Sequence, residues 1–279
     1  MIEFSSAISN DEKIIVAAIQ MRVGRSFDEN LREVQKMVPE AAEKGATIVA
    51  LPEYFYFPQV DDQPLEEAAS LTFDQTFKVL KDLSHEKKIL IEACLIENDS
   101  GSLFNTAFLF KDGKVVGRQR KVHVTAKEVK LGVSKWDEFG IVELDRLKLG
   151  VLVCADVLYP EACRVLGLFG CDIVFNPVVS FFNDVDVTKD ARDCLFVSRA
   201  IDNDYFLIKP SGIGKTPWGR KIVGRSLIAA PWGVIARYGD ENVPQVLTAE
   251  LDLDLLRQLR RENYSLTDRV KNAYKPLLV

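Results

Sequence analysis

The feature that most constrains the fold is an alternation of short apolar runs with amphipathic segments through the first two-thirds of the chain. The apolar runs occupy residues 14–21, 47–51, 89–96, 104–110, 149–154, 172–176, 205–209 and 226–230. Several of them are nearly continuous in apolar residues, as expected for strands that are covered on both faces. The alternation therefore predicts an α/β fold with a mixed sheet system and helices outside it.

Helices are expected between these runs, over about residues 26–45, 72–83, 160–170 and 188–201. Ser26 with Glu29, and Thr72 with Gln75, have the spacing of capping boxes, so each pair predicts the start of a helix. Asp112-Gly113 lies between two apolar segments and predicts a tight hairpin turn.

The overall organisation indicates one domain over residues 1–279, with a mixed tail from about residue 252 that we expect to pack on a partner subunit. The net charge is −5, and no basic stripe of the kind that binds nucleic acid is visible. No apolar stretch reaches the roughly 18 residues of a transmembrane helix, and the N-terminus lacks the apolar core of a secretory signal. We therefore expect a cytoplasmic protein that binds neither nucleic acid nor membranes.

The cysteines are odd in number and include no CxxC pair, which argues against a disulfide framework or a zinc site. They are Cys94, Cys154, Cys163, Cys171 and Cys194. Cys154 stands apart because it ends an apolar run in the segment GVLVCADVLYPE and a turn follows at once. α/β folds commonly place chemistry at such a strand end, so Cys154 is a candidate nucleophile.

A nucleophilic thiol needs a base or a positive environment. Only two histidines exist: His85 lies in a polar helix end, and His123 follows Lys121 by two residues, which leaves a Cys-His arrangement as an alternative. A carboxylate is the better candidate base. Glu53 follows an apolar strand and is flanked by apolar and aromatic residues, where burial would raise its pKa. Lys121 ends a basic strand, a position that by itself is more typical of a surface residue.

The segments LPE (51–53), RKVH (120–123) and GVLVCAD (150–156) resemble, in order and spacing, the motifs of the nitrilase, or carbon–nitrogen hydrolase, superfamily. The resemblance continues over nearly the whole chain after about residue 13, through VAAIQM, GLFGCDIVFNPV, SRAIDND, GRSLIAAPWG and AELDLDLLRQLRRENYSL. It implies a four-layer αββα sandwich, no metal or organic cofactor, and a homodimer or higher homo-oligomer. The expected interface includes the helices near residues 154–170 and 188–201.

The same resemblance implies a catalytic set made of Glu53, Lys121 and Cys154, with Glu128 as a second glutamate. Cys154 would attack an amide or nitrile carbon, while Glu53 moves the protons. Lys121 and a backbone N–H just after Cys154 would stabilise the oxyanion. Water would then hydrolyse the thioester.

Three positions depart from the family pattern: Ala155 replaces an aromatic residue, Leu158 an arginine and Ser211 an asparagine. Because Leu158 cannot clamp a carboxylate, we expect a small aliphatic amide that is not recognised through an acid group. Tyr54, Ala155 and Leu158 are the expected substrate-binding residues, and the aromatic run over residues 54–57 would supply apolar walls.

Several alternatives remain open at this point. Nitrile or N-carbamoyl hydrolysis would use the same residues, and acyl transfer from the thioester differs only in the entering nucleophile. A non-catalytic interaction protein of the same fold is a further alternative. Arg192, Arg199 or Lys215 could enter the pocket and create an anion site after all.

Overall fold

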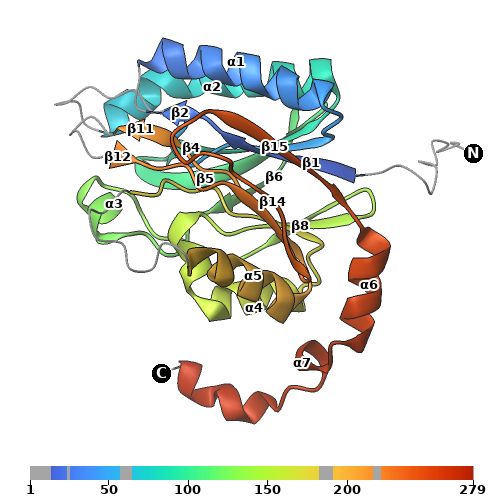
Figure 1. Ribbon diagram of the computed structural model, residues 1–279. Helices are drawn as coiled ribbons and strands as arrows, with labels where there is room; N and C mark the ends of the chain where they lie inside the picture. Colours follow the sequence, from blue (N-terminus) through green and yellow to red (C-terminus); the bar gives the residue numbers. More distant parts are fainter. Residues whose placement is uncertain (1–13, 24–25, 57–64, 182–190, 216–220, 279) are drawn as a thin grey trace, which may run out of the picture.

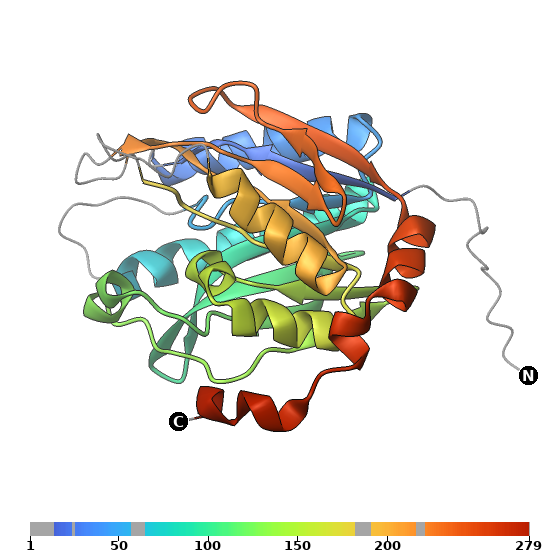
Figure 2. The same cartoon turned by 60° about the horizontal axis from the view of Figure 1, so that its bottom comes forward.

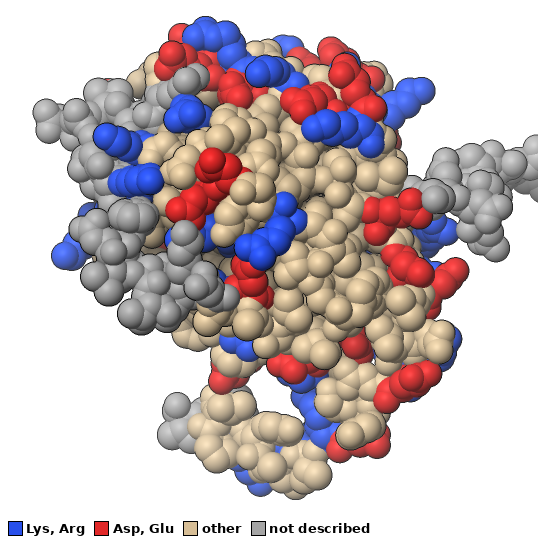
Figure 3. All heavy atoms as spheres, in the orientation of Figure 1, with Lys and Arg blue, Asp and Glu red and all other residues tan. Residues whose placement is uncertain are grey.

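The computed structural model describes residues 14–23, 26–56, 65–181, 191–215 and 221–278. Within these ranges, no helix is both long enough and apolar enough to cross a lipid bilayer. Figure 3 shows basic and acidic side chains intermingled over one face of the molecule, with uncharged surface between them.

Two six-stranded mixed sheets form the centre of the molecule. The first has the strand order β15-β1-β3-β4-β5-β6 and the second has the order β14-β13-β10-β9-β8-β7. The first sheet comprises β15 (Gln245–Leu251), β1 (Ile14–Gln20), β3 (Ile48–Ala50), β4 (Leu90–Asp99), β5 (Ser102–Lys111) and β6 (Lys114–Arg120). The second comprises β14 (Gly233–Arg237), β13 (Leu227–Ala230), β10 (Phe206–Lys209), β9 (Ile173–Phe175), β8 (Leu147–Val151) and β7 (Ile141–Leu144). Each of the eight apolar runs therefore contains a strand.

A third, smaller sheet lies beside them, with the order β12-β11-β2. Its strands are β12 (Lys221–Ile222), β11 (Ile213–Lys215) and β2 (Arg22–Val23).

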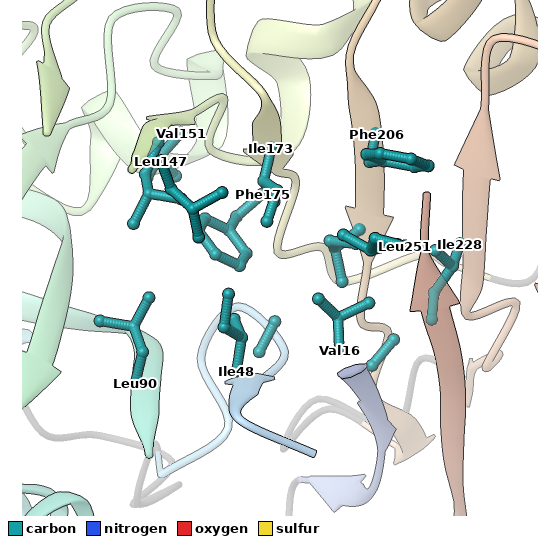
Figure 4. Close-up of a cluster of buried hydrophobic side chains, with 14 of the residues drawn as sticks. Val16, Ile48, Leu90, Leu147, Val151, Ile173, Phe175, Phe206, Ile228 and Leu251 are labelled. Atoms are coloured by element: carbon teal, nitrogen blue, oxygen red, sulfur yellow. The ribbon is translucent and has the colours of Figure 1, made fainter. Parts of the chain in front are cut away.

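Apolar side chains fill the space between the two large sheets (Figure 4). Val16, Ile48 and Leu90 from the first sheet face Leu147 and Phe175 from the second. All five side chains are at least 90% buried. Alternate residues of each strand thus form an inter-sheet core, and the other residues are free to face helices.

Helices cover both outer faces, which completes the predicted four-layer αββα sandwich (Figures 1 and 2). α1 (Phe27–Glu43) and α2 (Leu65–Lys87) lie on the first sheet, and α4 (Pro160–Leu168) and α5 (Arg192–Asn203) lie on the second. The remaining helical elements are α3 (Ala126–Lys130), the 3₁₀ turn η1 (Cys154–Leu158), α6 (Leu253–Glu262), α7 (Tyr264–Thr267) and η2 (Lys271–Leu278).

The two capping boxes have different outcomes. The first is confirmed, because the Glu29 N–H donates to Ser26 Oγ and the Ser26 N–H donates to Glu29 Oε2, both at 3.3 Å. The second is wrong: α2 already begins at Leu65, and Thr72 Oγ1 donates back to the Ala68 carbonyl at 2.7 Å inside the helix. Leu65 packs in an apolar cluster under the helix, and this tertiary contact extends α2 past the local signal.

Other local expectations can be compared in the same way. Asp112 and Gly113 both have positive φ, 50° and 74°, and join β5 to β6 as the hairpin predicts. α4 begins at Pro160 as expected. The expected start of the fourth helix near residue 188 lies outside the described residues, and α5 begins at Arg192.

The chain closes the first sheet with a pairing between its two distant ends. β15 pairs antiparallel with β1, from Ile14↔Leu251 to Gln20↔Gln245. The Gln20 side chain adds hydrogen bonds to the carbonyls of Asp240 (2.7 Å) and Val243 (2.9 Å). β1 is therefore an internal strand, with β3 on its other side.

Beyond β15 the chain leaves the sandwich (Figure 1). α6 still packs on the chain's own core through Leu253 and Leu256, so this part of the tail does not need a partner subunit to cover its apolar side chains. Farther along, Tyr264, Val270 and Leu277 are 75%, 71% and 59% exposed. These apolar side chains face away from the chain's own core.

Candidate active site

The predicted site residues follow the ends of strands in both large sheets. Glu53 follows β3 and Lys121 follows β6 in the first sheet, whereas Cys154 follows β8 in the second. Glu128 lies in α3, just beyond Lys121. The two sheets pack face to face, so their strand ends bring the four residues together.

Cys154 occupies a strained backbone position at the start of η1. Its φ is +47°, in the left-handed region that residues with a side chain seldom adopt. Such a conformation costs on the order of 1–3 kcal/mol and persists only when surrounding contacts hold it. Here the Cys154 N–H donates to the Pro177 carbonyl at 3.0 Å, and Asn176 Nδ2 donates to the Cys154 carbonyl at 3.2 Å. The turn thereby places the partly buried Cys154 at the sheet edge.

The Lys121 ammonium lies between two carboxylates. Its Nζ is 2.9 Å from Glu53 Oε1, and 2.8 Å and 2.9 Å from the two oxygens of Glu128. Lys121, Glu53 and Glu128 are all buried. The alternative of a surface lysine is therefore wrong, and Glu128 lies in the same cluster as expected.

Further hydrogen bonds fix the two carboxylates. Asn105 Nδ2 donates to Glu53 Oε1 at 2.9 Å and to Glu128 Oε1 at 3.2 Å. Tyr54 donates its hydroxyl to Glu128 Oε1 at 2.8 Å, and Thr125 Oγ1 donates to Glu128 Oε2 at 2.8 Å. Sequence reasoning did not identify Asn105, although an amide inside the apolar run FNTAFLF was a visible signal.

The thiol of Cys154 contacts the acid rather than a histidine. The Glu53 carboxyl group and the Val179 backbone N–H both lie close enough to the thiol to shift its pKa. The Val179 N–H also lies 3.3 Å from Glu53 Oε2. His123 instead places its Nδ1 2.8 Å from Asp156 Oδ1, so the geometry does not favour the Cys-His alternative.

The electrostatics divide the cluster into groups with different protonation states. Burial raises the pKa of the Cys154 thiol, and the nearby Glu53 charge raises it further, so the resting group is the thiol. Burial also raises the pKa of Glu53, against the pull of Lys121. Burial opposes the charge on Glu128 as well, but the Lys121 ammonium outweighs it and holds the pKa of Glu128 at about 2. Burial alone would lower the pKa of Lys121. The negative charge of Glu53 and of the other acidic groups outweighs burial and raises this pKa well above the ordinary value. The cluster therefore holds a permanent Lys121–Glu128 ion pair and a basic Glu53 beside a thiol.

The three expected substrate-binding residues have unequal surroundings. Tyr54 is hydrogen-bonded to Glu128, Ala155 is half-buried directly after Cys154, and the Leu158 side chain is exposed at the end of η1. Arg199 of α5 donates from Nε to the Val157 carbonyl at 3.1 Å, so its side chain stabilises the η1 turn. Lys215 is exposed.

The expected aromatic wall is wrong for two of its members. Phe55 and Tyr56 are fully buried in the core between the first sheet and its helices, and the Ile96 N–H donates to the Tyr56 hydroxyl at 2.7 Å. The chain turns after Glu53, with Tyr54 at φ +54°, and this turn directs the two following rings into the core. Phe57 lies outside the described residues.

A second buried lysine, absent from the sequence-based set, ends β10. Lys209 Nζ donates to the Arg225 carbonyl at 2.7 Å and lies 4.7 Å from the centre of the Phe196 ring. Burial lowers its pKa to about 7, although Asp193 attracts its charge. Among the described residues, no group of three or more His, Cys, Asp or Glu side chains is placed to hold a metal ion.

Residues 15–261 match the carbon-nitrogen hydrolase family. The deaminated glutathione amidase of a Synechocystis strain is 30% identical over 271 residues, which cover 92% of this chain and 98% of that protein. The omega-amidase of Xenopus tropicalis is 31% identical over 261 residues, which cover 90% of this chain and 92% of the relative.

Solved structures show the same fold. The carbon-nitrogen hydrolase from Helicobacter pylori G27 superposes with a TM-score of 0.85 at 24% identity, over 95% of this chain and 98% of that one. A mutant amidase from Nesterenkonia sp. AN1, with the acetamide moiety of fluoroacetamide bound covalently to its active-site cysteine, has a TM-score of 0.81 at 22% identity. The alignment covers 98% of this chain and 99% of that one.

Proposed function

This chain belongs to the carbon-nitrogen hydrolase family, and on that premise we propose that it is an amidase that hydrolyses a small amide through a thioester on Cys154. One observation carries the assignment of residues. The Cys154 thiol lies beside the buried Glu53, each shifts the pKa of the other, and Lys121 lies 2.9 Å from the same carboxyl group. A nucleophile, a base and a fixed positive charge thus meet at one point.

In the first half-reaction, Cys154 Sγ attacks the amide carbon while Glu53 accepts the thiol proton. The carbonyl oxygen becomes an oxyanion, to which the Lys121 ammonium and the Ala155 backbone N–H donate. One preorganised donor of this kind is worth about 3–4 kcal/mol of transition-state stabilisation. Glu53 then gives its proton to the nitrogen, the carbon–nitrogen bond breaks, and ammonia leaves the thioester.

In the second half-reaction, a water molecule takes the place of ammonia. Glu53 accepts a proton from this water as it attacks the thioester carbon, and Lys121 again stabilises the oxyanion. The carbon–sulfur bond breaks, the acid product leaves, and the proton on Glu53 returns to Cys154. The raised pKa of Glu53 suits both directions of proton transfer.

Glu128 is a positioning residue in this mechanism. With a pKa of about 2 it stays ionised at any pH at which the enzyme would work. Its two oxygens hold Lys121 in place and keep it charged, and Tyr54 and Thr125 orient the carboxylate in turn. The acid–base work is therefore left to Glu53.

The direct test is ammonia release from small aliphatic amides, N-carbamoyl compounds and nitriles. We expect the amides to be turned over fastest, and Cys154→Ala, Glu53→Gln and Lys121→Met each to lower kcat/KM by at least a thousandfold. Cys194→Ala is the matched control, since Cys194 is exposed on α5. A wild-type protein inactive on all three classes, or a Cys154→Ala variant with normal activity, would refute the proposal.

The substrate class can be narrowed with one pair of compounds. Because Leu158 offers no positive charge, we expect butyramide to be hydrolysed about as well as glutaramate, its ω-carboxylated analogue. A hundredfold preference for glutaramate corresponds to about 2.7 kcal/mol of transition-state binding. That result would show that a cation such as Arg192 or Arg199 anchors the acid. Acyl transfer is tested by adding hydroxylamine and measuring hydroxamate.

The assembly is part of the same proposal. We infer a cytoplasmic homodimer or higher homo-oligomer of single-domain chains. Apolar residues exposed on or beside α4 and α5 support this, namely Leu168 (39% exposed), Phe169 (43%) and Ile201 (52%). The tail from about residue 252 exposes Tyr264 and Leu277 beyond α6, and these apolar side chains would then pack on the partner subunit.

A further inference from the structure

Asp156 connects two chain segments that carry different parts of the site. It is fully buried in η1, two residues after Cys154. Its Oδ1 accepts from the His123 backbone N–H at 2.7 Å and from His123 Nδ1 at 2.8 Å. Its Oδ2 accepts from the Val153 N–H at 3.0 Å. One carboxylate therefore binds both the turn of Cys154 and the segment that carries Lys121.

The His123 ring is itself held in place. It stacks on Tyr159 with ring centroids 3.6 Å apart and planes 10° apart, and the Phe139 ring lies 6.1 Å away on centroids. Because Nδ1 faces an oxygen that accepts a second N–H, Nδ1 is the nitrogen that carries the proton. Tyr159 belongs to the chain just after η1, so the stacking is a second contact between the same two segments.

The contact matters because Lys121 and Cys154 belong to different sheets. Lys121 Nζ is fixed by Glu53 and Glu128, which both come from the side of the first sheet. Glu53 also contacts the thiol, which gives one link between the two sheets through a side chain that takes part in the reaction. The bond between His123 and Asp156 is a second link, and it involves neither the thiol nor the ammonium. His123 is two residues from Lys121 and Asp156 is two residues from Cys154, so their bond acts on both through short stretches of chain.

We propose that His123 and Asp156 form a clamp that sets the position of Lys121 relative to Cys154, which makes both of them positioning residues for the hydrolysis. This inference rests on the proposed function above. Misplacing a catalytic group by about 1 Å can reduce a rate about a hundredfold. Loosening the clamp should weaken the hydrogen bond from Lys121 to the oxyanion more than it weakens ground-state binding. It should therefore lower kcat and leave KM nearly unchanged.

The test compares His123→Leu, which keeps a similar volume without a donor, with His123→Asn, whose side-chain amide can still donate to Asp156 Oδ1. His85→Leu is the matched control, because His85 is the other histidine and is exposed at the end of α2. Turnover is measured on butyramide or glutaramate, whichever the wild-type protein hydrolyses faster. Alkylation of Cys154 by iodoacetamide is followed by mass spectrometry on the same samples.

The alkylation separates positioning from general damage. It is a displacement at saturated carbon that forms no oxyanion, so it needs an intact and accessible thiol but no aligned Lys121. For His123→Leu we expect kcat to fall at least thirtyfold, with KM and the Cys154 alkylation rate within threefold of wild type. His123→Asn should recover kcat to within threefold of wild type, and His85→Leu should match wild type.

Each other outcome is decisive. An unchanged kcat in His123→Leu, or a His123→Asn variant no better than His123→Leu, would overturn the clamp while the proposed function stands. Equal losses of turnover and alkylation would reduce the pair to a structural role and would also overturn it. A wild-type protein inactive on all amides would overturn the proposed function, and the clamp with it. If His123→Leu does not fold, Asp156→Asn is the second test. The asparagine NH₂ group would replace one of two oxygens that both accept N–H groups, so one hydrogen bond of the clamp is lost. We again expect kcat to fall while the alkylation rate of Cys154 is kept.

Discussion

Replacing Lys209 with methionine should stabilise the protein, by an amount that depends on pH. The Lys209 side chain lies under α5, with the Arg225 carbonyl as its hydrogen-bond acceptor and the Phe196 ring 4.7 Å from its Nζ. Burial lowers its pKa from 10.5 to about 7, and the repulsion from Arg225 acts in the same direction. In the unfolded chain the lysine regains its ordinary pKa of about 10.4.

The magnitude follows from proton linkage. Between about pH 7 and pH 10.5 the unfolded chain binds a proton that the folded chain lacks, so folding becomes more favourable as pH rises, by about 1.4 kcal/mol per pH unit. At pH 7 the folded state is penalised by about 4 kcal/mol in total. Methionine removes this penalty but loses the hydrogen bond to the Arg225 carbonyl, worth about 1 kcal/mol. We therefore expect Lys209→Met to be about 3 kcal/mol more stable at pH 7 and nearly equal to wild type at pH 9.5.

The assay is urea unfolding followed by far-UV circular dichroism at pH 6, 7, 8 and 9.5, at one fixed protein concentration so that any assembly contributes equally. Lys114→Met is the matched control, because Lys114 is exposed on β6. Taking the difference from wild type cancels the titration of all other groups. A gain that is the same at every pH, or a variant less stable than wild type at pH 7, would refute the reasoning.

Three further expectations concern the core, the thiol and the assembly. Burial raises the pKa of Glu92 well above its ordinary value, so stability should fall as pH rises above about 4.5. Glu92→Gln should then be more stable than wild type at pH 7 but not at pH 4 in urea unfolding, and equal gains at both would contradict this. Glu53→Gln removes a negative charge that raises the pKa of Cys154, so iodoacetamide should still label Cys154 although ammonia release is lost. The exposed Cys194 is the internal reference for the labelling. Loss of that labelling would argue against the pairing of Glu53 with the thiol. Light scattering at micromolar concentration should give at least twice the chain mass of 31.4 kDa, and a monomer mass would contradict the proposed assembly.

Local patterns in the sequence were sufficient for much of the fold. The Ser26 box, Pro160 and Asp112-Gly113 act within a few residues, and the structure has the expected helix starts and turn at all three. The apolar runs predicted strands because strands covered on both faces need such runs. Thr72 shows the limit, since packing of Leu65 extended α2 beyond a local signal of the same kind.

The site residues that lie in ordered sequence motifs could be predicted from the sequence. The residues whose role depends on burial in the folded chain could not. Glu53, Lys121 and Cys154 were singled out by their place at strand ends and by the family resemblance. Lys209 was overlooked because nothing in YFLIK indicates that α5 covers the lysine. Asp156 was overlooked as a partner of His123 because neither RKVH nor GVLVCAD contains a pattern that predicts contact with the other segment.

The pairing of β1 with β15 has a consequence for the order in which the protein is made. Residues 14–20 leave the ribosome early, but the strand that completes their side of the sheet ends at Leu251. Until then the sheet that carries Glu53 and Lys121 has an open apolar edge, which invites pairing with other chains. Pairing between such distant segments is also slow to form. Residues 245–251 must therefore be synthesised before the first sheet can close, and a chain truncated before residue 245 would be a ligand for chaperones rather than an enzyme.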